Sequence, residues 1–151
     1  MRREDVNSQL MHEISALNRK VRSLFDAMVK ERGLTLPRAR ALFSLSKKDG
    51  VNQRELAFEL ELETPTVVRL LDSMEEQGVV ERKAEGADRR AKQVHLTELG
   101  RETAADINLI AANFRNELMA EISEADMQVT LQTIRTLTAK VYAMDAQRTA
   151  E

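Results

Sequence analysis

Three arginines are the residues of this sequence best suited to chemistry, and the chemistry is recognition of phosphate groups and base edges. Arg69 lies in the segment TPTVVRLLDSMEE, and Arg89 and Arg90 lie in the run RKAEGADRRAK at residues 82–92. A planar guanidinium can donate two hydrogen bonds to O6 and N7 of guanine, or bind a phosphate. The run 82–92 holds five basic and two acidic side chains, whereas the whole chain has a net charge of -2. We therefore expect a local basic projection on an almost neutral protein.

Little in the sequence supports catalysis or metal binding. The chain has no cysteine and only two histidines, His12 and His95, which lie far apart in the sequence. Neither histidine belongs to a zinc-protease motif, and the five glycines are isolated rather than grouped in a phosphate-binding loop. Thiol switches, iron–sulfur clusters and Cys/His zinc sites are excluded, while a carboxylate-bound metal is not. We expect neither an enzyme nor a cofactor or metal site.

The length and composition predict a globular protein. The chain has 151 residues, of which 42% are hydrophobic and 32% charged, which suits one domain or two closely joined lobes. No apolar run approaches the roughly 20 residues of a membrane span, and the polar start MRREDVNSQ lacks the apolar core of a signal peptide. We expect a cytoplasmic protein.

Two short helices are expected to position Arg69. Asn52 and Glu55 have the spacing of a capping box, which predicts a helix that ends near residue 60. Thr64 as N-cap, followed by Pro65 at the first helical position, predicts the start of the next helix.

The apolar pattern across these helices favours a helix-turn-helix over a generic helical hairpin. Ala57 supplies the small side chain that two steeply crossing helices need where their backbones approach. Apolar residues that would fill the wedge between the helices are Leu56, Leu60, Leu62, Val67 and Leu70. Glu61 occupies the turn position that often carries glycine, so a left-handed backbone there would cost free energy.

A polar face of the second helix is predicted to point outward when Val67, Leu70, Leu71 and Met74 are buried. It contains Pro65, Thr66, Arg69, Asp72, Ser73 and Glu76. Such a helix fits the major groove of DNA, with its N-terminal residues nearest the base edges. Arg69 would bind a base or a phosphate, and Thr66 a thymine methyl or a phosphate. A solvated surface with one isolated arginine is the alternative.

A β-hairpin is predicted directly after this helix, from strands at 79–83 and 92–96. Its tip carries Arg89 and Arg90, and a thin basic projection of this kind can enter the minor groove. Asp88 is expected to brace an arginine rather than to face DNA, and Asp72 could do the same from the helix. Helix-turn-helix plus basic hairpin predicts a winged helix. Further DNA-binding candidates are Arg38, Arg40, Gln53, Arg54, Thr64 and Lys92, and a solvated surface is an equally open interpretation of Arg38, Arg40, Gln53 and Arg54.

Helical patterns flank this region on both sides. The first, with Asp5 or Asn7 as its cap, has an apolar seam at Leu10, Ile14, Leu17, Val21, Leu24 and Met28. Thr35 with Pro37 starts a second helix, Thr97 caps a long helix, and Ser123 with Asp126 starts the last one. A helix of about 24 residues is roughly 36 Å long, more than a small winged lobe can cover. We therefore expect these helices to form a dimer, with a monomeric bundle as the alternative.

The run NQRELAFELELETPTVVRLLDSMEEQGVVERKAEGADRRAKQVHLTELG resembles the winged-helix core of the MarR (multiple antibiotic resistance regulator) family of bacterial transcription factors. The most specific part is ADRRAKQVHLTELG, and the similarity extends over nearly the whole chain. The resemblance implies a mainly α (α+β) fold, with a winged helix-turn-helix domain at residues 33–100 and a helical dimerisation region at 1–32 and 101–151.

The same resemblance implies a homodimer that binds palindromic double-stranded DNA, and repression relieved by a small molecule. It also implies a recognition helix at 64–76 in the major groove, a wing at 84–92 in the minor groove, and pairing of Arg90 with Asp72. A winged helix that binds protein without DNA is the alternative, which the near-neutral charge of residues 33–100 keeps open. The effector and its pocket, the operator sequence and the sign of regulation have no signal in the sequence.

Overall fold

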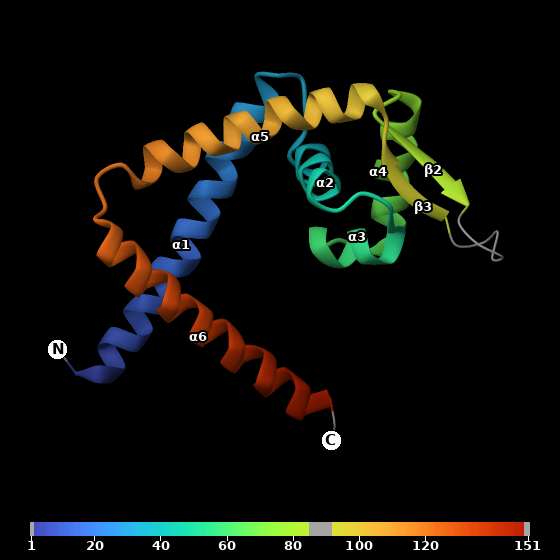
Figure 1. Ribbon diagram of the computed structural model, residues 1–151. Helices are drawn as coiled ribbons and strands as arrows, with labels where there is room; N and C mark the ends of the chain where they lie inside the picture. Colours follow the sequence, from blue (N-terminus) through green and yellow to red (C-terminus); the bar gives the residue numbers. More distant parts are fainter. Residues whose placement is uncertain (1, 85–91, 150–151) are drawn as a thin grey trace. The chain divides into compact units, whose positions relative to one another are not determined.

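The computed structural model describes residues 2–84 and 92–149, which form helices and a small antiparallel sheet (Figure 1). The elements are α1 (Arg3–Lys30), α2 (Leu36–Lys47), β1 (Val51–Asn52), α3 (Gln53–Leu60), α4 (Thr64–Glu76), β2 (Val80–Ala84), β3 (Lys92–Leu96), α5 (Glu98–Met119) and α6 (Glu124–Thr149). The predicted mainly α winged helix-turn-helix fold is confirmed. No helix within the described ranges has the length and apolarity of a membrane span.

The chain divides after Ala112 into two compact units, and the boundary lies inside α5. In the second unit, α6 has no buried residue among those described. The predicted division into residues 33–100 and the flanking regions 1–32 and 101–151 concerns a dimer, so it stays a prediction.

The core of the first unit is built where the helical and strand periodicities place apolar residues. Its largest fully buried side chains are Leu42, Leu45, Leu56, Leu71, Met74, Ile107, Val29, Val67, Val80 and Val94. Ala57 is also buried, as predicted for the crossing of α3 and α4, while Leu62 and Leu70 pack against the core and stay partly exposed. This core holds the α3–α4 pair and the sheet together as one body.

The sheet has the strand order β1-β3-β2, and both pairs are antiparallel. The two-residue strand β1 was not predicted, because two residues carry no detectable alternation. The first hairpin strand begins at Val80 and not at Val79 as predicted. Val79 donates its N–H to the carbonyl of Met74 (3.1 Å) and Gly78, at φ +72°, donates to Glu75, so Val79 completes the C-terminal cap of α4.

Several predicted helix caps are present. The Asn52 side chain accepts the N–H of Glu55 (2.9 Å), and the Glu55 carboxylate accepts the N–H of Asn52 (3.0 Å), which is the predicted capping box. Thr97 Oγ1 accepts the N–H of Gly100 (3.0 Å) at the start of α5. Ser123 caps α6 in the same way, since its hydroxyl oxygen accepts the N–H of Asp126 (3.1 Å).

Two predicted caps are wrong. Helix α1 begins at Arg3, so Asp5 and Asn7 lie inside it, and Asp5 acts from the third position by accepting the N–H of Arg2 (3.2 Å). Thr64 is the first residue of α4 and not its cap, because the last extended residue before the helix is Glu63. Pro65 is therefore the second residue of α4 and not the first. Proline is tolerated there because the N–H groups of the first helical turn have no partner within the helix.

Glu61 ends α3 in the left-handed conformation, with φ 56° and ψ 42°. We predict that Glu61→Gly raises the free energy of unfolding by about 0.5–1 kcal/mol, because glycine removes the steric penalty and gives back part of the gain as unfolded-state entropy. The exposed ion pair of Glu61 with Arg22 (3.7 Å) contributes little. Urea denaturation measures the change. Glu76→Gly, at the right-handed end of α4, should be destabilising. Equal effects of Glu61→Gly and Glu76→Gly would show that the left-handed backbone of Glu61 is not the cause.

Candidate nucleic-acid interface

Helix α4 presents a polar face whose composition matches the prediction. Val67, Leu71 and Met74 are fully buried, which turns the remaining faces of the helix outward. Thr64, Pro65, Thr66, Arg69, Asp72 and Glu76 are exposed, and Ser73 is half-buried. Arg69 has no ion-pair partner within the described ranges, so its guanidinium is free to bind an acceptor outside the chain.

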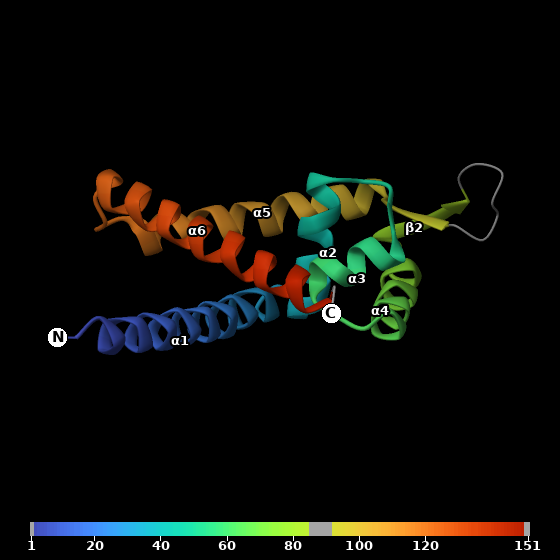
Figure 2. The same cartoon turned by 90° about the horizontal axis from the view of Figure 1, so that it is seen from below.

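Helix α4 lies next to β2, as Figures 1 and 2 show. Arg82, a residue that was not predicted from the sequence, forms hydrogen bonds across this contact. Its Nη2 atom donates to Oδ1 of Asp72 (2.6 Å) and to the carbonyl of Val68 (3.1 Å), and Nη1 donates to Oε2 of Glu75 (3.4 Å). Strand alternation could have identified Arg82 from the sequence, because it puts Arg82 on the same side of β2 as the buried Val80.

The predicted tip of the wing, with Asp88, Arg89 and Arg90, lies outside the described residues. Strands β2 and β3 pair as far as Ala84 and Lys92, so the hairpin expected from the sequence is present, and Lys92 is exposed at its edge. The predicted pairing of Asp72 with Arg90 stays a prediction.

Arg38 and Arg40, which were expected to bind phosphate, each have a partner within the protein. Arg38 Nη2 donates to the hydroxyl of Ser73 (2.6 Å) and so connects α2 to α4. Arg40 Nη1 donates to the carbonyl of Leu60 (3.0 Å), one of the last carbonyls of α3, which have no helical partner. Both arginines therefore stabilise the helix-turn-helix, and a direct role in DNA binding stays a prediction.

Gln53 and Arg54 occupy the first turn of α3. Gln53 is half-buried and Arg54 is exposed, and neither side chain forms a hydrogen bond or ion pair with the described residues. The Arg54 guanidinium, at the N-terminus of α3, marks a second place where a phosphate could bind.

The two histidines do not lie in a metal site. His12 is exposed on α1, and the Nδ1 atom of His95 lies 3.2 Å from Oδ2 of Asp49. Within the part of the chain that the structure describes, no cluster of three or more His, Asp or Glu side chains could hold a metal ion.

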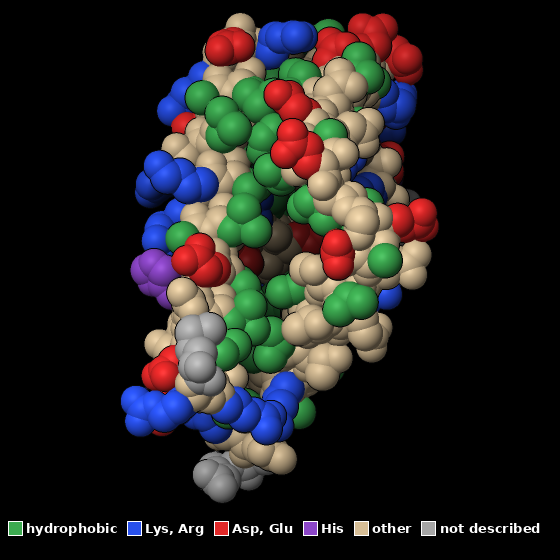
Figure 3. Space-filling model, turned by 90° about the vertical axis from the view of Figure 1, so that its left-hand side faces the viewer, with side chains coloured by type: hydrophobic (Ala, Val, Ile, Leu, Met, Phe, Trp, Pro, Cys, Tyr) green, Lys and Arg blue, Asp and Glu red, His purple; other side chains and the backbone are tan. Residues whose placement is uncertain are grey.

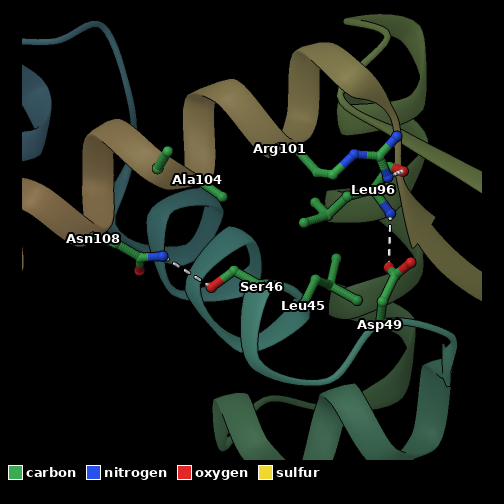
Figure 4. Close-up of a pocket in the computed structure, with 8 residues that line it drawn as sticks. Leu45, Ser46, Asp49, Leu96, Arg101, Ala104 and Asn108 are labelled. Carbon is green, nitrogen blue, oxygen red and sulfur yellow. Dashed lines mark hydrogen bonds between the residues drawn. The ribbon is translucent and has the colours of Figure 1, made fainter.

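A cavity of about 190 Å³ lies among α2, β3 and α5 (Figure 4). It is lined by Leu45, Ser46, Asp49, Leu96, Arg101, Ala104, Ala105 and Asn108. Asp49 accepts the N–H of Leu96 (2.9 Å), and Arg101 donates to the carbonyl of the same residue (2.9 Å). Asn108 donates to Ser46 (3.2 Å), while its Oδ1 atom is buried without a hydrogen-bond partner in the described chain.

Known proteins resemble this chain in sequence and in fold. A family model described as the MarR family matches residues 32–91. The uncharacterized HTH-type transcriptional regulator YwoH of Bacillus subtilis (strain 168) is 30% identical over 123 residues, which are 82% of this chain and 89% of that protein.

Solved structures extend the similarity to the tertiary fold. The transcriptional regulator PA3341 has a TM-score of 0.82 and 34% identity, and the match covers 89% of this chain and 98% of that one. Streptococcus pneumoniae FabT, solved in complex with DNA, has a TM-score of 0.78 over 91% of this chain and 99% of that one. Its identity of 17% supports the shared fold alone.

Proposed function

Because this chain belongs to the MarR family of transcriptional regulators, we propose that it is a homodimeric repressor of a palindromic operator and that a small molecule relieves the repression. As a member of this family, the chain is a DNA-binding regulator of transcription and not an enzyme. In the proposed complex, α4 occupies the major groove and the segment 84–92 the minor groove of double-stranded DNA. We also propose that the chain acts in the cytoplasm, together with the DNA that it regulates.

The observation that carries the DNA-binding proposal is the outward face of α4. Thr64, Thr66 and Arg69 are exposed on its N-terminal half, and the hairpin β2–β3 begins beside its other end. This is the arrangement in which a recognition helix reads base edges while an adjacent projection contacts the backbone or the minor groove. The DNA complex of FabT, which has the same fold, supports the assignment.

The proposal of a homodimer rests on apolar side chains that the single chain leaves at its surface. Leu10, Leu17 and Leu24 follow one another at intervals of seven residues along α1, and all three are exposed. Figure 3 shows hydrophobic side chains at the surface of the molecule. On α6, Val129, Ile134 and Val141 are exposed. A second copy of the chain would bury them, and two recognition helices about 34 Å apart would meet successive major grooves.

The cavity among α2, β3 and α5 supports the proposal of an effector site. It has apolar walls and a few polar groups, which is the usual character of a small-molecule pocket. A ligand there would touch both α2 of the winged region and the first turns of α5, which leads into the proposed dimerisation region.

The test is selection of bound duplexes from random DNA by the full chain. We expect palindromic sequences, a complex containing two chains per duplex, and an affinity that falls about tenfold or more between 50 and 200 mM salt. The magnitude is modest because residues 33–100 are close to neutral, with 11 basic and 12 acidic side chains. Fluorescence anisotropy measures the affinity and its salt dependence, and sedimentation measures the number of chains per duplex. A screen for compounds that release the DNA then searches for effectors. No binding at low salt, or binding that ignores ionic strength, would favour a protein partner over DNA.

A further inference from the structure

We propose that Arg82 is a positioning residue for DNA binding, which sets the rotation of α4 and neutralises two carboxylates of that helix. The proposal rests on the proposed function of α4 as the recognition helix. Arg82 itself is not expected to touch DNA, because its side chain is only 14% exposed and is directed at α4.

The contacts of Arg82 form one line along α4. Val68, Asp72 and Glu75 follow at intervals of four and three residues, so they lie on one side of the helix. The backbone N–H of Arg82 adds a fourth contact, because it donates to Oε1 of Glu75 (3.1 Å). One strand residue thus holds two turns of α4, and the direction in which the neighbouring Arg69 points depends on it.

Arg82 also neutralises negative charge on α4. The helix carries Asp72, Glu75 and Glu76 in its C-terminal half and only one basic residue, Arg69. Asp72 and Glu75 are about half exposed, at 53% and 42%. Without Arg82 their negative charges would repel the phosphates of a duplex that Arg69 attracts.

The geometry of Arg82 is not that of a residue optimised for stability alone. Its Nε atom is buried and has no hydrogen-bond partner in the described chain, which costs free energy. Ion pairs to half-exposed carboxylates, made by an arginine with one unsatisfied donor, contribute little net stability. We infer that the contacts of Arg82 serve to fix the orientation of α4 and to neutralise Asp72 and Glu75.

The experiment measures the affinity of the full chain for its selected duplex after Arg82→Met, which keeps a long apolar stem and removes the charge. We expect a loss of about tenfold, with the complex otherwise intact. In the Arg82→Met background, Asp72→Asn with Glu75→Gln should recover at least half of the lost affinity on a logarithmic scale, because the unpaired carboxylates are gone. Arg82→Lys, which keeps the charge and loses the forked hydrogen bonds, should be intermediate. Lys48→Met, which removes one exposed positive charge directly after α2, is the control and should bind like the unaltered chain.

Each result decides between explanations. Unchanged affinity of Arg82→Met would overturn the proposal, and so would a loss that neutralising Asp72 and Glu75 does not reduce, since a purely structural role of Arg82 predicts no rescue. If Arg82→Met does not fold, as judged by circular dichroism, Arg82→Lys and its combination with the two neutral variants give the same comparison. Failure of the unaltered chain to bind any duplex would refute the proposed function itself, whereas binding without dependence on Arg82 would refute only this inference.

Discussion

Gly100→Ala is expected to lower the free energy of unfolding by about 3 kcal/mol or more, because it forces an atom into the backbone of Val79, the residue before β2. A Cβ at this position would lie 1.9 Å from the carbonyl oxygen of Val79 and 2.9 Å from its carbonyl carbon. That carbonyl also accepts the N–H of Thr97 (3.2 Å), and the Thr97 hydroxyl donates to the carbonyl of Gly78 (2.6 Å). Val79 therefore cannot move away without breaking bonds that join α4, the sheet and the start of α5.

Gly33→Ala is the matched control for this prediction. Gly33 has φ +74° and no atom within 4 Å of the added Cβ, so only the left-handed conformation is penalised, by about 1–2 kcal/mol. Guanidinium denaturation of the full chain measures both variants. Equal losses at the two positions would show that crowding against Val79 is not the cause.

Arg69→Ala is expected to weaken specific DNA binding by about 1–3 kcal/mol, with the loss concentrated at one base pair. Arg69 is exposed on α4 and forms no ion pair with the described residues, so its guanidinium is available to a base edge. Thermal stability should change by no more than about 0.5 kcal/mol, as for other exposed substitutions. Anisotropy titrations against duplexes altered one base pair at a time measure the affinity and its sequence dependence together.

Lys48→Ala, at an exposed position after α2, is the control for Arg69→Ala and should leave every affinity unchanged. A loss that is uniform across duplex sequences, with a shallower salt dependence, would show that Arg69 binds a phosphate rather than a base. Unchanged affinity for all duplexes would exclude α4 as the recognition helix in the proposed orientation.

Local sequence patterns were sufficient for the helices and for the two strands of the hairpin. The capping box of Asn52 and Glu55, the small residue Ala57 between two apolar helices, and the alternation of residues 92–96 were each confirmed. They could be predicted because caps, helical periodicity and strand alternation connect residues within a few positions of one another. The outward face of α4 followed from the same periodicity.

The partners of the charged side chains were decided by the tertiary structure alone. Arg82 meets Asp72 across ten positions, Arg38 meets Ser73 across 35, and His95 meets Asp49 across 46. Such pairs depend on how separate elements pack, and no spacing in the sequence encodes that distance. For the same reason β1, which exists only through its pairing with β3, had no sequence signal.

The sequence by itself thus determined the order of the helices and of the two hairpin strands, the resemblance to a regulator family, and which side of α4 carries Arg69. Only the tertiary structure decided that Arg38 and Arg40 bond within the protein, that Arg82 holds α4, and that Gly100 faces the backbone of Val79. The physical reason is that secondary structure arises from interactions between near neighbours, whereas these contacts form when distant segments are packed together.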